Sequence, residues 1–591
     1  MPSPLPWSLS RSRGSASARL DLWGYVSLAA LVAVAGLMSS AFWLSSRPPL
    51  QDLPQHLAAV RVLFDGAHPG FAFERFFEVD WWRSQYLGTY VLLGGAFYAL
   101  RALVDQPLLV ATRCLLALLA FAWPLAAELG YRKLGRRSGL GAFALVFFFN
   151  VHLILGFLNF VLGIVACLLG LASLASARAA ARAGRLARGP LIGWSASALA
   201  CFYLHVVPFA LLAGCLLWTA GIELGIAPLW RRLRGRPPAG NLPRAALAAP
   251  LLAFLPALAA CVAWLFTPAG LSTREAARGA GTRGQAVYSS FETNRTELER
   301  WLMDAFASPW DTRWALGALA VLMLWLVVEV AAEGWARRNA RRSAGAPPDE
   351  ATSRPAATSL APCVFGSSVG LDRPLLWALR AFVPVSLALY FVLPSSYDWI
   401  WPINARFPLL GALALPLLLP VPRARAAAGL RAFRAVALCG LLACATGEAL
   451  VARGAFAGFE RELRGLDDVL AAIPDGQRTA TLVFDRHSRH VGFAPFLHVG
   501  AYYQAERGGV SFFSFADFPQ SPIHFREDNR PPRVPPRWEW TPERARERDL
   551  TWFDYVITRG GPGRFGAGRT FEPIGRFGRY RLFRKRDLAA R

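Results

Sequence analysis

The sequence has few charged residues, few lysines and no cysteines at CxxC spacing. Only 17% of its 591 residues are charged, against about 25% in an average soluble protein, which argues against an ordinary soluble enzyme, a disordered chain or a coiled coil. The 64 basic residues include only two lysines, Lys133 and Lys585. None of the cysteines forms a CxxC pair, so no zinc or redox motif is predicted. No GxGxxG motif follows a predicted strand and no P-loop occurs, which excludes these nucleotide-binding motifs.

Long apolar runs are abundant instead. Hydrophobic residues make up 54% of the chain and the mean hydropathy is +0.33. Runs of about 18 or more apolar residues recur over the first 450 positions, and each is a candidate transmembrane helix. The net charge of +25 comes mainly from short arginine-rich clusters between these runs. That distribution follows the positive-inside rule rather than a nucleic-acid-binding surface. The chain is therefore predicted to be a polytopic α-helical membrane protein without a nucleic-acid partner.

Eleven spans are predicted from the apolar runs. They cover residues 22–44, 107–130, 138–157, 158–177, 191–207, 208–226, 246–267, 314–334, 375–394, 407–421 and 433–452. With the N-terminus in the cytoplasm, the basic clusters at 132–137, 178–188, 231–236, 337–342 and 423–434 all become cytoplasmic. The apolar segment 86–100 would reverse this pattern if it spanned alone. We expect it to be a re-entrant or interfacial helix, or half of a further pair, so the total is 11 to 13 spans.

This topology divides the chain into parts with different environments. Residues 1–21 form a cytoplasmic tail, and residues 22–453 form the transmembrane domain with outer loops at 45–106 and 268–313. Residues 335–374 are rich in Pro, Ala and Ser and are predicted to be a flexible cytoplasmic linker. The parity of the spans places residues 454–591 outside the cytoplasm.

Residues 454–591 are predicted to form a small α/β domain. Strands are expected at 479–484, 510–515 and 555–558, a strand or hairpin edge at 577–583, and a helix at 496–507 that Gly508 and Gly509 close. Four of the eight histidines lie here, namely His487, His490, His498 and His524. The HxxH pair lacks the glutamate of HExxH, so ordinary loop and strand histidines are favoured over a metal site.

The first outer loop contains the strongest candidates for chemistry. Pro54 favours the first turn of a helix and Gly66 can close it. Asp52 and His56 are four residues apart and would lie on the same side of that helix. Together they could deprotonate a hydroxyl or hold a phosphate. The alternative is structural: Asp52 caps the helix and His56 is an interfacial side chain.

The architecture resembles the GT-C superfamily of integral membrane glycosyltransferases, which includes protein mannosyltransferases and the lipid A aminoarabinose transferase. The resemblance rests on a first span, a long outer loop with the juxtamembrane acid Asp52, many further spans and an outer C-terminal domain. Asp80 and Arg406-Phe407 match more weakly, and Asp52-Leu-Pro-Gln-His56 replaces the usual acidic pair. The resemblance implies that Asp52 is the catalytic base. Asp80 is then a second carboxylate or a metal ligand, or alternatively a solvated acid beside Arg83.

Further polar residues lie at the predicted outer ends of spans. His152 lies in the turn between two spans, His205 precedes Pro208, and Arg406 ends a short outer loop. Ionisable groups in spans are costly and suggest a site, and a guanidinium can bind a phosphate bidentately. Under the GT-C resemblance these three residues would hold the lipid phosphate. The alternatives are that the histidines satisfy backbone groups at tight turns and that Arg406 anchors the interface.

The sequence therefore predicts a glycosyltransferase of the bacterial inner membrane. The resemblance implies transfer of a sugar from a polyprenyl-phosphate sugar to an extracytoplasmic glycan, lipid or protein acceptor. Membrane lipids are the other expected partners. The pattern requires no cofactor, and it leaves open whether a divalent metal ion binds. A transporter or flippase would explain the spans and polar turns but not the outer α/β domain, and no inverted hydropathy repeat was found. A non-catalytic GT-C-like scaffold is the third alternative.

Overall fold

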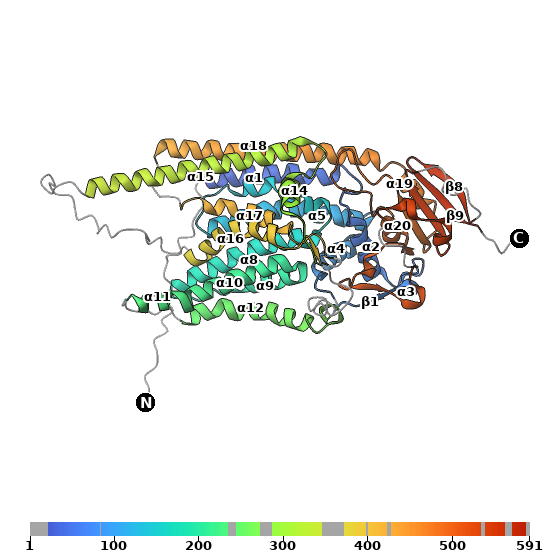
Figure 1. Cartoon of the computed structure of the whole chain (residues 1–591), viewed down its shortest axis with the longest axis horizontal. Coiled ribbons are helices and arrows are strands. Elements are labelled where there is room, and N and C mark those ends of the chain that lie inside the picture. Colours follow the sequence, from blue (N-terminus) through green and yellow to red (C-terminus); the bar gives the residue numbers. More distant parts are fainter. Residues whose placement is uncertain are drawn as a thin grey trace, which may run out of the picture.

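The computed structural model describes residues 22–82, 84–234, 244–271, 286–344, 372–397, 400–421, 427–532, 538–561 and 570–586. In these residues a bundle of helices runs along the longest axis of the molecule, and a β-sheet from the C-terminal part lies at one end (Figure 1). We call this the sheet end. The predicted fold class, a polytopic α-helical membrane protein with a C-terminal α/β domain, is confirmed. The predicted tail 1–21 lies outside the described residues.

Six of the described helices are long and apolar enough to cross a bilayer. They are α1 (Leu22–Ser39, continued by the 3-10 helix η1, Ser40–Trp43), α5 (Pro107–Lys133), α8 (Leu158–Arg182), α15 (Pro309–Ala344), α16 (Arg373–Val392) and α18 (Ala428–Glu462). The remaining helices of the bundle are α4 (Leu87–Leu100), α9 (Arg188–Leu204), α10 (Val206–Gly221), α11 (Ala227–Leu233), α12 (Arg244–Trp264) and α17 (Arg406–Ala414). At 14 residues, α4 is about 21 Å long and is too short to cross about 30 Å of hydrocarbon by itself.

The segment 138–157, predicted as a span, is a broken helix that still runs from beside Ser27, near the start of α1, to beside Asp52 at the sheet end. It contains only α6 (Gly141–Val146) and α7 (Val151–Ile154). Asn150 causes the break: its side-chain oxygen accepts the N–H of Leu153 at 3.1 Å, and its amide donates to the carbonyls of Phe147 and Phe148 at 3.0 Å. The residues from 140 to 156 are buried. Irregular backbone is tolerated at membrane depth when it is enclosed by protein and its polar groups are satisfied.

Two helices extend beyond the limits predicted for them. α15 continues to Ala344, so the first ten positions of the predicted linker 335–374 are helical, and its residues 345–371 lie outside the described part. α18 continues to Glu462, past the predicted domain boundary at 453. The carboxylate of Glu460 accepts hydrogen bonds from Ser45 and Ser46, which follow the first span. One continuous helix thus connects the bundle rigidly to the C-terminal domain.

The C-terminal domain is built on a five-stranded sheet in the order β5-β4-β7-β9-β8. Its strands are β4 (Arg478–Val483), β5 (Val510–Ser511), β7 (Tyr555–Arg559), β8 (Phe571–Phe577) and β9 (Tyr580–Lys585). β4 is parallel to β5 and β7, whereas β9 is antiparallel to β7 and β8. The predicted strands are found, with β5 shorter than expected. The predicted helix 496–507 begins later, as α20 (Ala501–Arg507), and α19 (Leu466–Ala471) precedes the sheet.

The C-terminal domain is packed against the first outer loop. Helix α2 (Leu53–Asp65) contacts α20, and β1 (Phe77–Val79) pairs antiparallel with β6 (Ile523–Phe525). The backbone N–H of Gly509 donates to the carbonyl of Phe71 at 2.7 Å. These contacts join segments from opposite ends of the sequence into one unit at the sheet end.

A buried arginine reinforces this interface. Arg47 is 2% exposed, and its guanidinium donates to Glu506 through Nε at 3.1 Å and through Nη2 at 2.8 and 2.9 Å. Its Nη1 contacts Asp467 at 2.5 Å. The two neighbouring carboxylates raise the pKa of Arg47 despite its burial, whereas burial raises the pKa of Glu506. A guanidinium without these partners would be strongly unfavourable here.

We predict that Arg47→Ala lowers the thermal stability of the purified protein. Loss of one partner of a buried ion pair costs about 3–5 kcal/mol, mainly because the remaining charge stays buried. Arg295→Ala is the matched control, because the Arg295–Glu292 pair on α14 (Phe291–Met303) is exposed and such pairs contribute little. The melting temperature, followed by tryptophan fluorescence in detergent, should fall for Arg47→Ala alone. Equal melting temperatures for both variants would contradict this account.

Candidate functional site

Asp52 lies at the start of α2, where the sequence predicted it. Its backbone carbonyl accepts the N–H groups of Gln55 and His56, and Pro54 occupies the first turn. The carboxylate makes no capping hydrogen bond to the helix. Instead, Oδ1 of Asp52 is 3.3 Å from Nε2 of His498, a residue of the C-terminal domain. The capping alternative for the Asp52 side chain is therefore not observed.

The turn between α7 and α8 holds Asp52 in place. The N–H groups of Gln51 and Asp52 donate to the carbonyls of Ile154 and Leu155 at 2.9 and 3.1 Å. Gly156 has φ +85°, and a Cβ at this position would be 2.9 Å from the nitrogen of Asp52. Any larger residue would be strained and would push Asp52 away. The broken span thus has a positioning role at the candidate site.

His56 is buried beside the carboxylate. Its Nδ1 is 3.1 Å from the hydroxyl of Tyr90 in α4, and the imidazole also hydrogen-bonds the backbone of Gly156. Burial is the largest cause that lowers the pKa of His56, partly opposed by the negative charge of Asp52. His56 is therefore neutral at neutral pH, and it is better suited to hydrogen bonding than to carrying charge.

Aromatic side chains of the C-terminal domain cover this carboxylate and its histidines. The ring of Phe513 stacks on His498 with centroids 4.7 Å apart and an interplanar angle of 12°, and Phe515 contacts the edge of His56 at 5.2 Å. Gln55 holds these two phenylalanines in place. Its side-chain Nε2 donates to the carbonyl of Phe513 at 3.0 Å, and its Oε1 accepts the N–H of Phe515 at 3.4 Å. The side chains of Asp52 and His498 are 14% and 6% exposed.

Sequence reasoning did not identify His498 as a partner of Asp52. It was considered only as one of four histidines of the C-terminal domain. The contact joins residues at opposite ends of the chain, and no local spacing encodes it. The pairing depends on the packing of α2 against α20, which the sequence alone did not predict.

The three residues predicted to bind a lipid phosphate do lie together. Arg406 begins α17, His152 lies in α7, and His205 precedes α10. All three contact Phe160: its ring is 5.0 Å from His152, 5.1 Å from His205 and 5.9 Å from the guanidinium carbon of Arg406. All three are at most 8% exposed. We call Arg406, His152 and His205 the cationic cluster.

The cationic cluster has unused hydrogen-bonding capacity. Nε2 of His152 contacts the carbonyl of Ala405 at 3.1 Å, and Nδ1 of His205 accepts the N–H of Val207. Nδ1 of His152 and Nε of Arg406 are buried and have no partner among the described residues. No carboxylate in the described part of the chain forms an ion pair with Arg406. A buried guanidinium without an anion is costly, and such unsatisfied groups call for an explanation.

Helix α4 connects the carboxylate with the cationic cluster. Tyr86 precedes α4 and its ring is 5.6 Å from His205, while Tyr90, in the first turn, contacts His56. Residues four apart on a helix are separated by about one turn of 5.4 Å. The side-chain oxygen of Asn159 accepts the N–H of Thr89, which lies between the two tyrosines, at 3.4 Å. Asp52, His56 and the cationic cluster therefore form one candidate site at the sheet end of the bundle.

Asp80 lies outside this group of contacts. It follows β1, its N–H donates to the carbonyl of Pro522, and its carboxylate accepts the N–H of Trp82 at 3.0 Å. The described residues contain no group of three or more His, Cys, Asp or Glu side chains that could hold a metal ion. The structure thus joins Asp52 with His56, and Arg406 with both histidines, but it does not bring Asp80 to them.

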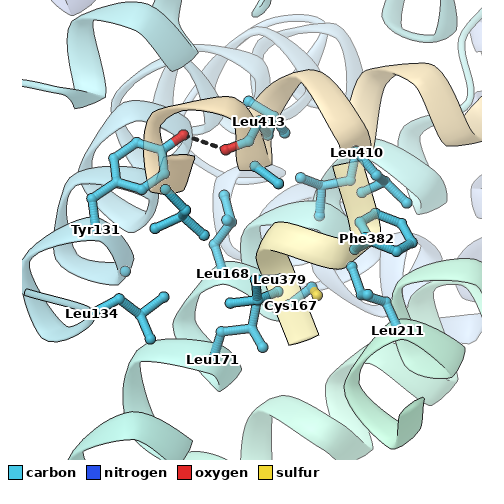
Figure 2. Close-up of a pocket in the computed structure, with 14 residues that line it drawn as sticks. Tyr131, Leu134, Cys167, Leu168, Leu171, Leu211, Leu379, Phe382, Leu410 and Leu413 are labelled. Atoms are coloured by element: carbon cyan, nitrogen blue, oxygen red, sulfur yellow. Dashed lines mark hydrogen bonds between the residues drawn. The ribbon is translucent and has the colours of Figure 1, made fainter. Parts of the chain in front are cut away.

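An apolar pocket lies inside the bundle, on helices that also carry residues of the cationic cluster. It lies between α5, α8, α10, α16 and α17, and Figure 2 shows leucines around it together with Cys167 and Phe382. The hydroxyl of Tyr131 donates to the carbonyl of Leu413 at 2.6 Å, so its polar group is satisfied. Leu410 lies one helical turn after Arg406, and Ile164 lies one turn after Phe160. Two helices thus lead directly from the cationic cluster to hydrocarbon-like surroundings.

Comparisons with known proteins find similarity only to solved structures, at low sequence identity. No family model matches the sequence, and no curated relative matches it. Among solved structures, ArnT from Cupriavidus metallidurans bound to undecaprenyl phosphate is similar with a TM-score of 0.49 and 12% identity, over 96% of this chain and 98% of that chain. The apo state of the same protein gives a TM-score of 0.43 and 12% identity, over 95% and 97%.

We predict that acidification destabilises the protein partly through His56. The buried imidazole has a lowered pKa in the folded state, whereas in the unfolded chain it titrates at about 6.5. Below that pH the unfolded state binds the proton and the folded state does not, so stability falls as the pH decreases. His56→Asn should reduce the fall in melting temperature between pH 7 and pH 5. His68→Asn is the control, since His68 is exposed, and an unchanged pH dependence in His56→Asn would contradict the assignment.

Proposed function

We propose that the chain is a membrane glycosyltransferase that transfers a sugar from a polyprenyl phosphate to a hydroxyl of a glycan, lipid or protein acceptor. The observation that carries this proposal is that helix α4 links the surroundings of a carboxylate to a buried guanidinium that forms no ion pair among the described residues. Tyr90 contacts His56, four residues after Asp52, and Tyr86, one helical turn earlier, contacts His205 of the cationic cluster. Glycosyl transfer from a lipid phosphate needs a base for the acceptor and a cation for the leaving phosphate.

Asp52 is the general base in this mechanism. It removes the proton from the acceptor hydroxyl while the oxygen attacks the anomeric carbon. His498, 3.3 Å from Oδ1, orients the carboxylate and leaves its other oxygen for the acceptor. His56 supports the same geometry through Tyr90 and Gly156. A positioned base of this kind contributes about 10²–10⁴ in rate.

The cationic cluster stabilises the leaving group. As the bond between the anomeric carbon and the phosphate oxygen breaks, its electron pair moves onto the phosphate. Arg406 offers its buried Nε, which lacks a partner among the described residues. His205 accepts the N–H of Val207 on Nδ1, so its proton lies on Nε2 and can be donated to the phosphate, while His152, whose Nε2 donates to Ala405, completes the cluster. The product is a polyprenyl phosphate with its charge held by Arg406. The apolar pocket that begins one turn below Arg406 accommodates the first part of the prenyl chain.

The sheet end faces the outside of a bacterial inner membrane in this proposal, and the N-terminus lies in the cytoplasm. The support is the distribution of charge along the bundle. Arg178 and Arg182 pair with Asp372 and Glu223, and Arg434 pairs with Glu329, near the end opposite the sheet. Basic residues concentrate on the cytoplasmic side of membrane proteins. The C-terminal domain then covers the site from the outside.

We predict that Asp52→Asn lowers the turnover number by about 10²–10⁴, because the amide cannot accept the proton. Asp80→Asn is the comparator, since its carboxylate makes the local contact with Trp82. Transfer is measured with radiolabelled polyprenyl-phosphate sugars and membrane extract as acceptor. Equal loss in both variants would assign Asp80 a catalytic role as well. Full activity of Asp52→Asn would exclude Asp52 as the base.

We predict that Arg406→Gln lowers the turnover number by about 10²–10³, the usual effect of losing one group that stabilises transition-state charge. Arg406→Lys keeps the charge but not the bidentate geometry, and its activity should lie between those of Arg406→Gln and the wild type. The same assay with saturating donor separates turnover from donor binding. Wild-type turnover in Arg406→Gln would contradict a role for this residue at the leaving phosphate.

A further inference from the structure

A second cavity lies on the sheet-end side of the cationic cluster. It has a volume of about 390 Å³, within the range of sites for small molecules of about 300–1,000 Å³. Its walls come from α14, from the segment that leads into α17, and from loops of the C-terminal domain. The residues that define its chemistry are Asn294, Glu297, Arg300, Trp301, Trp401 and Trp540.

Aromatic rings form much of the cavity surface. Trp301 is 7% exposed and its ring contacts Trp401 at 5.5 Å. Trp401 and Trp540 also line the cavity and are 43% and 39% exposed. Large aromatic rings supply flat apolar contact area at a small loss of conformational freedom.

Polar groups of both charges lie beside these rings. The carboxylate of Glu297 accepts the Nε1–H of Trp301 at 3.3 Å, and the guanidinium of Arg300 lies 4.3 Å from the ring centre of Phe493. Arg300 is exposed and Glu297 is partly exposed, so both have capacity for a ligand. Since their charges compensate, the cavity favours an uncharged polar molecule over a free phosphate or nucleic acid.

The cavity is directly connected to the candidate site. Trp301, in its wall, stacks on His152 of the cationic cluster, with centroids 6.1 Å apart and an interplanar angle of 20°. Asn404 also lines the cavity and lies two residues before Arg406. Its side-chain amide donates to Asn294 at 3.3 Å and to the carbonyl of Tyr390 at 2.9 Å. A ligand in this cavity would therefore be next to the proposed phosphate site.

We propose that this cavity binds a sugar ring, with its C–H face stacked on Trp401 and its hydroxyls bonded to Glu297, Arg300 and the amides. A pyranose combines an apolar face with a polar edge, which is the combination that the cavity presents. The inference deepens the proposed function and rests on it for the identity of the sugar, which belongs either to the lipid-linked donor or to a glycan acceptor. Carbohydrate binding itself requires no turnover.

The test measures binding of sugars to the full-length protein in detergent, carrying Asp52→Asn to prevent transfer. One set of probes is the methyl glycosides of glucose, mannose, galactose and N-acetylglucosamine; the other is the same sugars on a short polyprenyl phosphate. Saturation-transfer NMR and titration of tryptophan fluorescence report binding. Trp401→Ala and Glu297→Gln are added as cavity variants, and Trp82→Ala is the matched control, because Trp82 is 84% exposed elsewhere on the outer loop.

We expect at least one probe to bind, with affinity reduced tenfold or more by Trp401→Ala and Glu297→Gln and unchanged by Trp82→Ala. An effect on free glycosides identifies an acceptor sugar site. An effect confined to the lipid-linked probes, and shared with Arg406→Gln, identifies the donor sugar. Probe binding that both cavity variants leave unchanged, or no binding of any probe by folded protein, would overturn the proposal. If sugars bind through the cavity while the wild type transfers none, the proposed function fails and the binding site stands.

Discussion

The candidate site depends on the packing of the C-terminal domain against the first outer loop. Asp52 belongs to that loop, whereas His498 and the aromatic cover belong to the domain. The buried Arg47–Glu506 pair, the β1–β6 pairing and the bonds of Gln55 all hold these two parts together. Separation of the parts would expose the carboxylate and remove its histidine. The C-terminal domain is therefore a part of the candidate site.

A second constraint comes from the bundle, where the guanidinium of Arg406 forms no ion pair with any carboxylate that the structure describes. Arg406 is 8% exposed and packs against Phe157 and Phe160. A protein that required only stability would neutralise or replace such a group. The helix that carries Arg406 leads in one turn to an apolar pocket, and the segment before it leads to an aromatic and polar cavity. The donor that we propose, with a prenyl chain, a phosphate and a sugar, would place one of its parts in each of these three environments.

Much of the fold was predictable from local sequence, and the site only in part. Pro54 and Gly66 predicted the limits of α2, and alternating or apolar runs predicted the strands of the C-terminal sheet, because these signals act over a few residues. Arg406, His152 and His205 were predicted as site residues because ionisable groups at membrane depth are costly, and the structure places them together, while their role at a phosphate stays a prediction. The break within the predicted span 138–157 was missed, because hydropathy does not register the hydrogen bonds by which Asn150 breaks the helix. His498 and Tyr90 were missed, because their contacts with Asp52 and His56 arise from packing between distant segments.

The central claim is that Asp52 and His498 act as one unit that the C-terminal domain assembles. A double-mutant cycle on the transfer rate tests it most directly, with Asp52→Asn, His498→Gln and the combined variant measured at saturating donor. Residues that act as a unit have non-additive effects. The account predicts that His498→Gln lowers turnover in the wild type and that the combined variant is no slower than Asp52→Asn alone. Losses that multiply in the combined variant would show that the two residues act independently, and they would contradict the account.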